Sequence, residues 1–378
     1  MPCAICANID PTLNNVENAA RLDTSEASIR RHKAAQHNAL EQVDSFFTDV
    51  PSTMITSRGR STRLPDGSWE KVTWQPNKAV LAEALSYDDL SDILSSNPQP
   101  VKPLSSLLGR ELQQPEGVGV LCMTDLQAGK ATERGGGTPE TMAVVRRSIE
   151  RFKDKVVRHE PETVLLVDDG DPIENVFNVG TQPHTNDLDV PAQIRAARRI
   201  FALAIKELAP HTRDLRFVSV PSNHGAFRTS LKTQGGSSDA DFGLEINYCL
   251  EEQFEDRPGF EHVTFVRPIP LEETAVVEAG GTRLAFAHGH QSGGIYKHGE
   301  WWAKQDHGRR PGWNADIFTF GHFHTHVQYQ SGDARWVIGA ASPDPGSKWY
   351  TDKTGETSER GLTYFFANNG ALGDIGIV

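Results

Sequence analysis

Two histidines separated by one residue follow an apolar run late in the chain, and imidazoles at that spacing can bind a metal ion. The run Ile317–Phe320 stops at Gly321, and His322 and His324 come next. Alternate side chains of an extended segment point the same way, so the two rings can converge. One such pair among 14 histidines is weak evidence alone. It gains weight because four apolar runs upstream also end in residues that bind metals.

The four upstream runs end in aspartate, glutamine, asparagine or histidine. These runs, at 118–123, 164–167, 215–220 and 284–287, are short and almost continuously apolar, as strands buried on both faces are. With the histidine pair, the candidate ligands are Asp125, Gln127, Asp171, Asn223, His288, His322 and His324. They offer only oxygen and nitrogen, which suits Mn, Fe, Zn or Ni better than a thiolate-loving ion. Seven ligands are too many for one tetrahedral ion and enough for two ions that share a carboxylate.

The elements that must position these ligands alternate in type. Helices are predicted over 139–159 and 191–208, between the apolar runs. Strands that alternate with helices predict a layered α/β domain, which we assign to 116–378. Functional groups in such folds gather at the carboxyl ends of the strands, so we expect the seven ligands to meet at one edge.

The ordered motifs resemble those of the calcineurin-like metallophosphoesterases. They are Asp-x-Gln at 125–127, Gly-Asp-x-x-Glu-Asn at 170–175, Asn-His at 223–224, His-Gly at 288–289 and Gly-His-x-His at 321–324. The likeness spans roughly residues 116 to 345, and the Asp-Leu-Gln-x-Gly opening resembles the double-strand-break repair nuclease branch, which includes phage-encoded members. It implies a four-layer α/β/β/α sandwich whose second sheet is completed by 336–338 and 362–366.

The resemblance also implies a role for each ligand. One ion would be held by Asp125, Gln127 and His324, the other by Asn223, His288 and His322, and Asp171 would bridge the two. Two cations about 3.5–4 Å apart can clamp a phosphoryl group and acidify a water for in-line attack.

Two further residues would act on the substrate. His224 would point toward the phosphate, where it would stabilise the transition state or protonate the leaving oxygen. Arg228 could hold a non-bridging phosphate oxygen.

The sequence departs from the family pattern at two places. Gln127 stands where histidine is usual, and its neutral amide is a weaker ligand. Gly225 stands where an acidic residue usually orients the histidine, and Asp239 or Asp241 could replace that partner. These departures keep open a DNA-binding or scaffold protein with a degenerate metal centre.

The first 40 residues are interpreted as a separate zinc module. Cys3 and Cys6, with His32 and His37, can close a tetrahedral zinc site. Two short predicted helices lie between these pairs, and the segment resembles small zinc-stabilised helix-turn-helix modules. The alternative is a reduced N-terminus with incidental cysteines.

The second of these helices carries basic residues that suit nucleic-acid contacts, namely Arg30, Arg31 and Lys33. Residues 41–115 are interpreted as a connecting region with a hairpin, whose turn is at 65–67, and a helix over 79–94.

Composition limits the class of protein. No apolar stretch is long enough to span a bilayer, no signal-peptide pattern begins the chain, and four cysteines are too few for a disulfide scaffold, so we expect a cytoplasmic protein without membrane partners. The net charge of −12 opposes general nucleic-acid coating.

We interpret the chain as a dinuclear-metal phosphoesterase and, more specifically, as a DNA or RNA nuclease. The alternative is a phosphatase or cyclic-nucleotide phosphodiesterase with a small substrate, which the acidic composition favours. The metal, the cleavage polarity and the oligomeric state are left open.

Overall fold

The computed structural model describes residues 14–23, 58–63, 69–74, 116–131, 136–177, 186–346 and 358–378. Contacts divide the chain into two units, residues 1–76 and 77–378. The first unit contains helix α1 (Asn15–Arg21), capped by Asn14, and an antiparallel pair of strands, β1 (Arg58–Arg63) and β2 (Trp69–Trp74). The predicted zinc ligands Cys3, Cys6, His32 and His37, the basic residues Arg30, Arg31 and Lys33, and the predicted helix over 79–94 lie outside the described residues.

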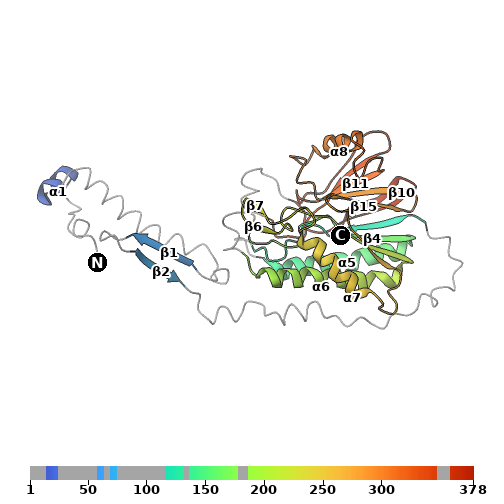
Figure 1. Ribbon diagram of the computed structural model, residues 1–378, viewed down its shortest axis with the longest axis horizontal. Helices are drawn as coiled ribbons and strands as arrows, with labels where there is room; N and C mark the ends of the chain where they lie inside the picture. The colour runs from blue at the N-terminus through green and yellow to red at the C-terminus, as the bar shows by residue number, and fades with distance from the viewer. Residues whose placement is uncertain are drawn as a thin grey trace. The chain divides into compact units, whose positions relative to one another are not determined.

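The second unit contains a six-stranded sheet (Figure 1). In sheet order its strands are β15 (Ala371–Ile377), β14 (Thr363–Asn368), β3 (Val118–Cys122), β4 (Thr163–Asp168), β5 (Asp214–Ser219) and β8 (Val263–Val266). The four strands from β3 to β8 are parallel, and β14 and β15 are antiparallel additions at one side. The predicted runs at 118–123, 164–167 and 215–220 thus form the centre of this sheet.

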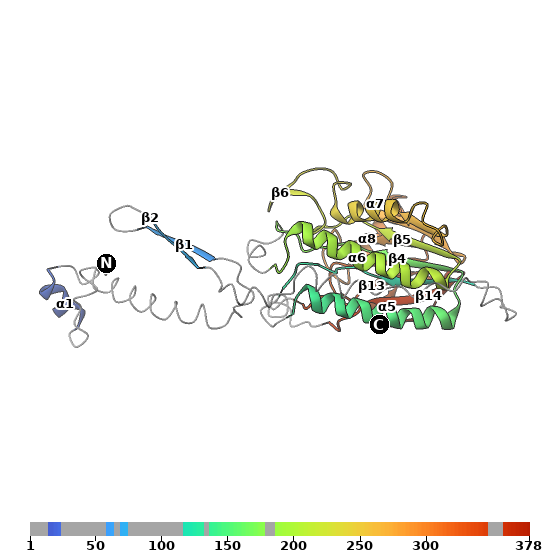
Figure 2. The same ribbon diagram turned by 90° about the horizontal axis from the view of Figure 1, so that it is seen from below.

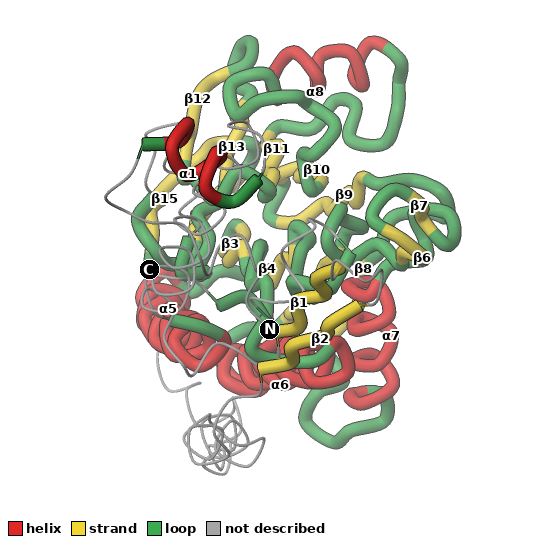
Figure 3. The backbone as a smooth tube through the Cα atoms, turned by 90° about the vertical axis from the view of Figure 1, so that its left-hand side faces the viewer, coloured by secondary structure: helices red, strands yellow, loops and turns green. Residues whose placement is uncertain are grey.

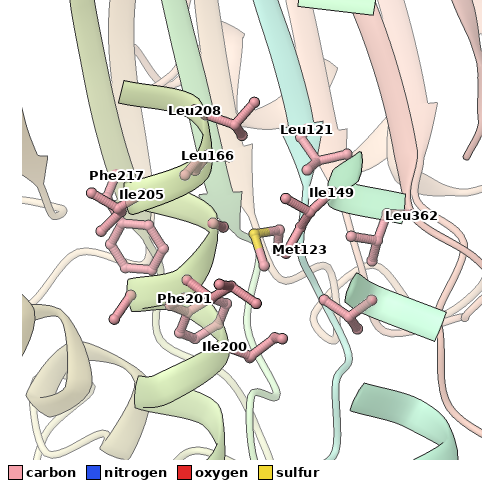
Figure 4. Close-up of a cluster of buried hydrophobic side chains, with 14 of the residues drawn as sticks. Leu121, Met123, Ile149, Leu166, Ile200, Phe201, Ile205, Leu208, Phe217 and Leu362 are labelled. Carbon is pink, nitrogen blue, oxygen red and sulfur yellow. The ribbon is translucent and has the colours of Figure 1, made fainter. Parts of the chain in front are cut away.

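Three helices cover the outer face of this sheet (Figure 2). They are α5 (Thr138–His159), α6 (Val190–Leu208) and α7 (Phe242–Phe254), and the short 3-10 helix η5 (Ala209–His211) follows α6. The buried residues of α5 recur every three or four positions and include Met142, Val145, Ile149 and Phe152, which is the period of one helix face. Figure 4 shows such side chains packed between the helices and strands. The two predicted helices are confirmed, each beginning one residue earlier than expected.

The second sheet has five strands. In sheet order they are β12 (Val327–Gln330), β13 (Trp336–Gly339), β11 (Ile317–Phe320), β10 (Thr282–Ala287) and β9 (Thr274–Ala279). Its inner face packs on the first sheet through residues such as Phe286, Ile317 and Ile338. Helix α8 (His298–His307) packs on the outer face, with Trp302 against Phe318. Figure 3 shows this α/β/β/α order, which confirms the four-layer prediction.

One part of the predicted topology is wrong. Residues 336–338 lie in the second sheet as expected, but 362–366 belong to the first sheet, where β14 pairs antiparallel with β3 from Thr363 opposite Cys122. Phe366 of β14 packs against Phe152 of α5, whereas Phe365 joins the core between the sheets. A strand buried on both faces has the same apolar pattern in either sheet, so its pairing could not be read from composition.

A short hairpin, β6 (Arg228–Ser230) and β7 (Thr233–Gln234), completes the described strands. Within the described residues, no helix has both the length and the apolar character needed to cross a membrane.

Adjacent valines of α5 test this packing. Val156 is fully buried and Val157 is 54% exposed. We expect Val156→Ala to lower the free energy of unfolding by about 1.5–3 kcal/mol, because the variant loses buried methyl groups and leaves a cavity. Val157→Ala, the matched control, should change it by less than about 0.5 kcal/mol. Urea denaturation measures both, and equal effects would contradict this orientation of α5.

Candidate metal centre

Five of the seven predicted ligands lie on turns with left-handed backbone. Asp125, Gln127, Asp171, His322 and His324 all have φ between 40° and 67°. Residues other than glycine rarely adopt this backbone conformation, and those that do cluster at functional sites. The strands end at one edge of the sheets, and the turns that follow them direct the ligand side chains toward one another.

Four ligands meet at the fully buried ring of His288. Its Nε2 lies 2.8 Å from Asn223 Oδ1 and 3.1 Å from Asp171 Oδ2. Its Nδ1 lies 2.8 Å from the carbonyl oxygen of Asp169, which can only accept, so Nδ1 carries a proton and Nε2 faces the cluster. Asp171, His288 and His322 each offer a ligand atom within 4.8 Å of the others, so the three residues could hold a metal ion. We call this group, with Asn223, the His288 half-site.

Of the neighbouring carboxyl groups Asp169 and Asp171, only Asp171 is held in its ionised form. Burial raises the pKa of Asp171, but His288 and His224 outweigh it and hold the pKa well below its usual range. Burial raises the pKa of neighbouring Asp169 to about 8, so that carboxyl is neutral at pH 7. Burial and His288 lower the pKa of His322 to about 3, which keeps its imidazole in the neutral form that binds metals.

Asp125 and His324 form the other half, which we call the Asp125 half-site together with Gln127. Asp125 Oδ2 accepts hydrogen bonds from Thr124 Oγ1 and the His322 amide, both at 2.9 Å. Its Oδ1 is buried without a hydrogen-bond donor and lies 3.2 Å from His324 Nε2. Burial lowers the pKa of His324, but Asp344 and Asp125 outweigh it and raise the pKa to about 10, so a protonated imidazole faces this oxygen. A metal ion bound to His324 would have to displace that proton.

A lysine enters the Asp125 half-site. Lys130 Nζ donates to Gln127 Oε1 and to the carboxylate of Asp344. Burial lowers the pKa of Lys130, but Asp344 and Glu174 outweigh it and raise the pKa above its ordinary value. The side chain therefore carries a full positive charge between Gln127 and Asp344. Neither Lys130 nor Asp344 was predicted as part of the centre.

His224 has an acidic partner, but not one of the two expected. Its Nδ1 lies 3.0 Å from the Glu174 carbonyl oxygen and 3.4 Å from Glu174 Oε2. Its amide donates to Asp171 Oδ1 at 2.7 Å. Burial lowers the pKa of His224, but Asp171 and Glu174 outweigh it and raise the pKa. Glu174 is the glutamate of the Gly-Asp-x-x-Glu-Asn motif, so its spacing from Asp171 was the signal that could have identified it.

The prediction of Asp239 or Asp241 as this partner is wrong. Asp241 caps α7 by accepting from the amides of Gly243 and Leu244 and also accepts from that of Ser222. Asp239 accepts from the Leu271 amide. Both carboxylates are engaged by backbone groups elsewhere.

Arg228 lies beside the centre at the start of β6. Its Nε and Nη2 donate to the Asn223 carbonyl oxygen at 3.4 and 3.3 Å. Those bonds tie the guanidinium to a candidate ligand residue and keep it at the rim of the site.

Comparison with known proteins gives no family assignment. No protein-family model and no curated protein matches this sequence. Among solved structures, the chain is similar to an uncharacterized predicted phosphoesterase of Streptococcus pneumoniae, at 11% identity over 68% of this chain and 86% of that chain, with a TM-score of 0.27. It is also similar to Vps29 of Chaetomium thermophilum, at 11% identity over 66% and 84% with a TM-score of 0.30. The sulfate thiohydrolase SoxB of Thermus thermophilus gives 12% identity over 71% and 57%, with a TM-score of 0.27. Similarity this distant does not identify a chemistry.

Metal binding should depend on His288. We expect His288→Ala to lose tight Mn²⁺ binding in titration calorimetry, because the variant removes the nitrogen on which Asp171 and Asn223 converge. At a Mn²⁺ concentration 100 times Kd, the ion should raise the free energy of unfolding of the wild type by about 2.7 kcal/mol. It should not raise that of the variant. His307→Ala, at the exposed end of α8, is the control and should keep both effects. Unchanged affinity in His288→Ala would rule out this half-site.

Proposed function

We propose that this protein is a metal-dependent hydrolase of phosphate esters, of the calcineurin-like metallophosphoesterase type. The observation that carries the proposal is the convergence of Asp171, Asn223, His288 and His322, from both sheets, beside the buried carboxylate of Asp125. Such oxygen and nitrogen ligands favour Mn, Fe, Zn or Ni. A divalent cation held there supplies Lewis acidity toward a phosphoryl oxygen and lowers the pKa of a water.

The protein's own groups position the proton donor. Asp171 fixes the backbone of His224, while Glu174 accepts from Nδ1 and raises the pKa of the ring. That arrangement leaves Nε2 as the nitrogen that delivers a proton to the leaving oxygen. Arg228 lies within the same rim and offers its guanidinium to a non-bridging phosphate oxygen.

We further propose that the ester is a phosphodiester of DNA or RNA. The support is the order of the motifs and the predicted N-terminal module with Arg30, Arg31 and Lys33, together with the predicted structural zinc at Cys3, Cys6, His32 and His37. The net charge of −12 favours the alternative, a small phosphoester or cyclic nucleotide.

A substrate panel separates these two classes. Purified protein with Mn²⁺ is assayed on single- and double-stranded DNA, RNA, cyclic nucleotides and nitrophenyl phosphoesters. Cleavage of nucleic acid whose KM rises steeply with salt supports the nuclease proposal, since a polyanion releases counterions on binding. Hydrolysis of small esters alone, with little response to salt, supports the alternative.

His224 should carry the acid step. We expect His224→Ala to lose on the order of 10²–10⁴ in kcat, while most of the Mn²⁺ affinity is preserved because the His224 ring bonds to Glu174 and not to a ligand of the His288 half-site. Asp171→Ala should lose both activity and ion binding. Full activity in both variants would mean that a contaminant is responsible and that the centre is degenerate.

Glu174 should raise the pKa at which His224 loses its proton. Because the Glu174 carboxylate raises the pKa of His224, Glu174→Gln should lower that pKa, and the alkaline limb of the kcat profile should move to lower pH. The loss in kcat should be smaller than in His224→Ala. Glu252→Gln, an exposed change on α7, is the control. A kcat profile that does not move would show that Glu174 has no part in the proton transfer.

A further inference from the structure

The Asp125 half-site already contains a positive charge that belongs to the chain. Lys130 is fixed close to Gln127, since its amide donates to the Gln127 carbonyl oxygen at 2.9 Å and its Nζ to Gln127 Oε1 at 2.5 Å. The lysine side chain is only 14% exposed. Both hydrogen bonds to one residue hold the ammonium at the amide oxygen that was expected to bind an ion.

Asp344 is the counter-ion for this ammonium and also faces His324. Its side chain is 3% exposed and accepts from Lys130 Nζ, while its Oδ1 lies 3.4 Å from His324 Nδ1 and accepts from the Gly346 amide at 3.0 Å. The Asp344 amide donates to Ser342 Oγ, which itself donates to the Asp125 carbonyl oxygen at 2.8 Å. A buried lysine is stable only with a well-placed partner, and this partner is built into the same network as the ligands.

We propose that Lys130 replaces one of the two metal ions. The centre then binds one divalent ion tightly, in the His288 half-site, and the Lys130 ammonium supplies the positive charge of the Asp125 half-site. The proposal rests on the proposed phosphoesterase function and specifies its cofactor count. In the reaction, the Lys130 ammonium attracts the phosphate as a point charge.

Two physical arguments support the replacement. A divalent ion bound to Gln127 Oε1 would lie next to the ammonium on the same oxygen, and like charges repel strongly in a buried site. The amide of Gln127 is also a neutral and weak ligand, but its carbonyl oxygen is a good acceptor for an ammonium. Gln127 and Lys130 therefore form a matched pair, and this pairing gives a reason for the departure from histidine at position 127.

The test counts Mn²⁺ ions on the full chain by titration calorimetry and by electron paramagnetic resonance. Mn²⁺ is chosen because the predicted Cys3 and Cys6 site prefers zinc. We expect the wild type to bind one tight ion with the spectrum of isolated Mn²⁺. Lys130→Met should gain a second ion, bound at least tenfold more tightly than any second ion of the wild type, with the spectrum of a spin-coupled pair.

Three further variants comprise two controls and a second test. Lys130→Arg keeps the charge and should stay at one ion, whereas Lys130→Gln lacks the charge but can still form hydrogen bonds and should gain a second ion. Lys130→Gln decides the matter if Lys130→Met does not fold. Lys153→Met removes a lysine paired with Glu207 between α5 and α6 and should leave the count unchanged.

The outcomes separate this inference from the function. Two tight, coupled ions in the wild type would overturn the role of Lys130 and leave the phosphoesterase proposal standing. A folded Lys130→Met or Lys130→Gln protein without a second ion would also overturn it. If the wild type binds no Mn²⁺ and is inactive with every metal, the proposed function itself fails.

Discussion

Asp171 is the ionised carboxylate on which the centre depends. It is buried at the end of β4 beside Asp168 and Asp169, whose pKa values burial raises, yet its own pKa is held low by His288 and His224. One oxygen faces His288, and the other accepts from the His224 amide. A single negative charge therefore organises both the ligands and the candidate acid.

The centre exists only where the two sheets meet. Asp125, Asp171 and Asn223 follow strands of the first sheet, and His288, His322 and His324 follow strands of the second. A methyl group at Gly170 would lie 2.7 Å from His288 Nδ1, and one at Gly321 would clash with the Asp125 carboxylate. Only glycine permits this close approach at each sheet's edge. Ligand geometry is thus set by the apolar packing between the sheets, through residues such as Val120, Leu165 and Phe286.

Sequence reasoning worked where the information was local. An apolar run can be read from a few residues, which is why the central strands and two helices were predicted, and the residue types that follow these runs are what made them candidate ligands. It failed where partners are distant. The run at 362–366 has the same pattern in either sheet, and Asp344 lies 214 positions from Lys130, so no spacing connects them. Glu174 is the intermediate case, because it lies in a recognised motif but its contact with His224 depends on the fold.

In the same network, different carboxylates stabilise different positive charges. A cation bound to Asp171 would neutralise the charge that favours protonation of His224. Glu174, whose Oε2 lies 3.4 Å from His224 Nδ1, then becomes the main group that keeps this ring protonated. At the other end, Asp344 balances Lys130 and faces His324, so the Asp125 half-site does not depend on Asp171 for its charge. Because Glu174 is the partner of His224 and Asp344 is the partner of Lys130, neither cation has to take the negative charge of Asp171, which remains available to a metal ion.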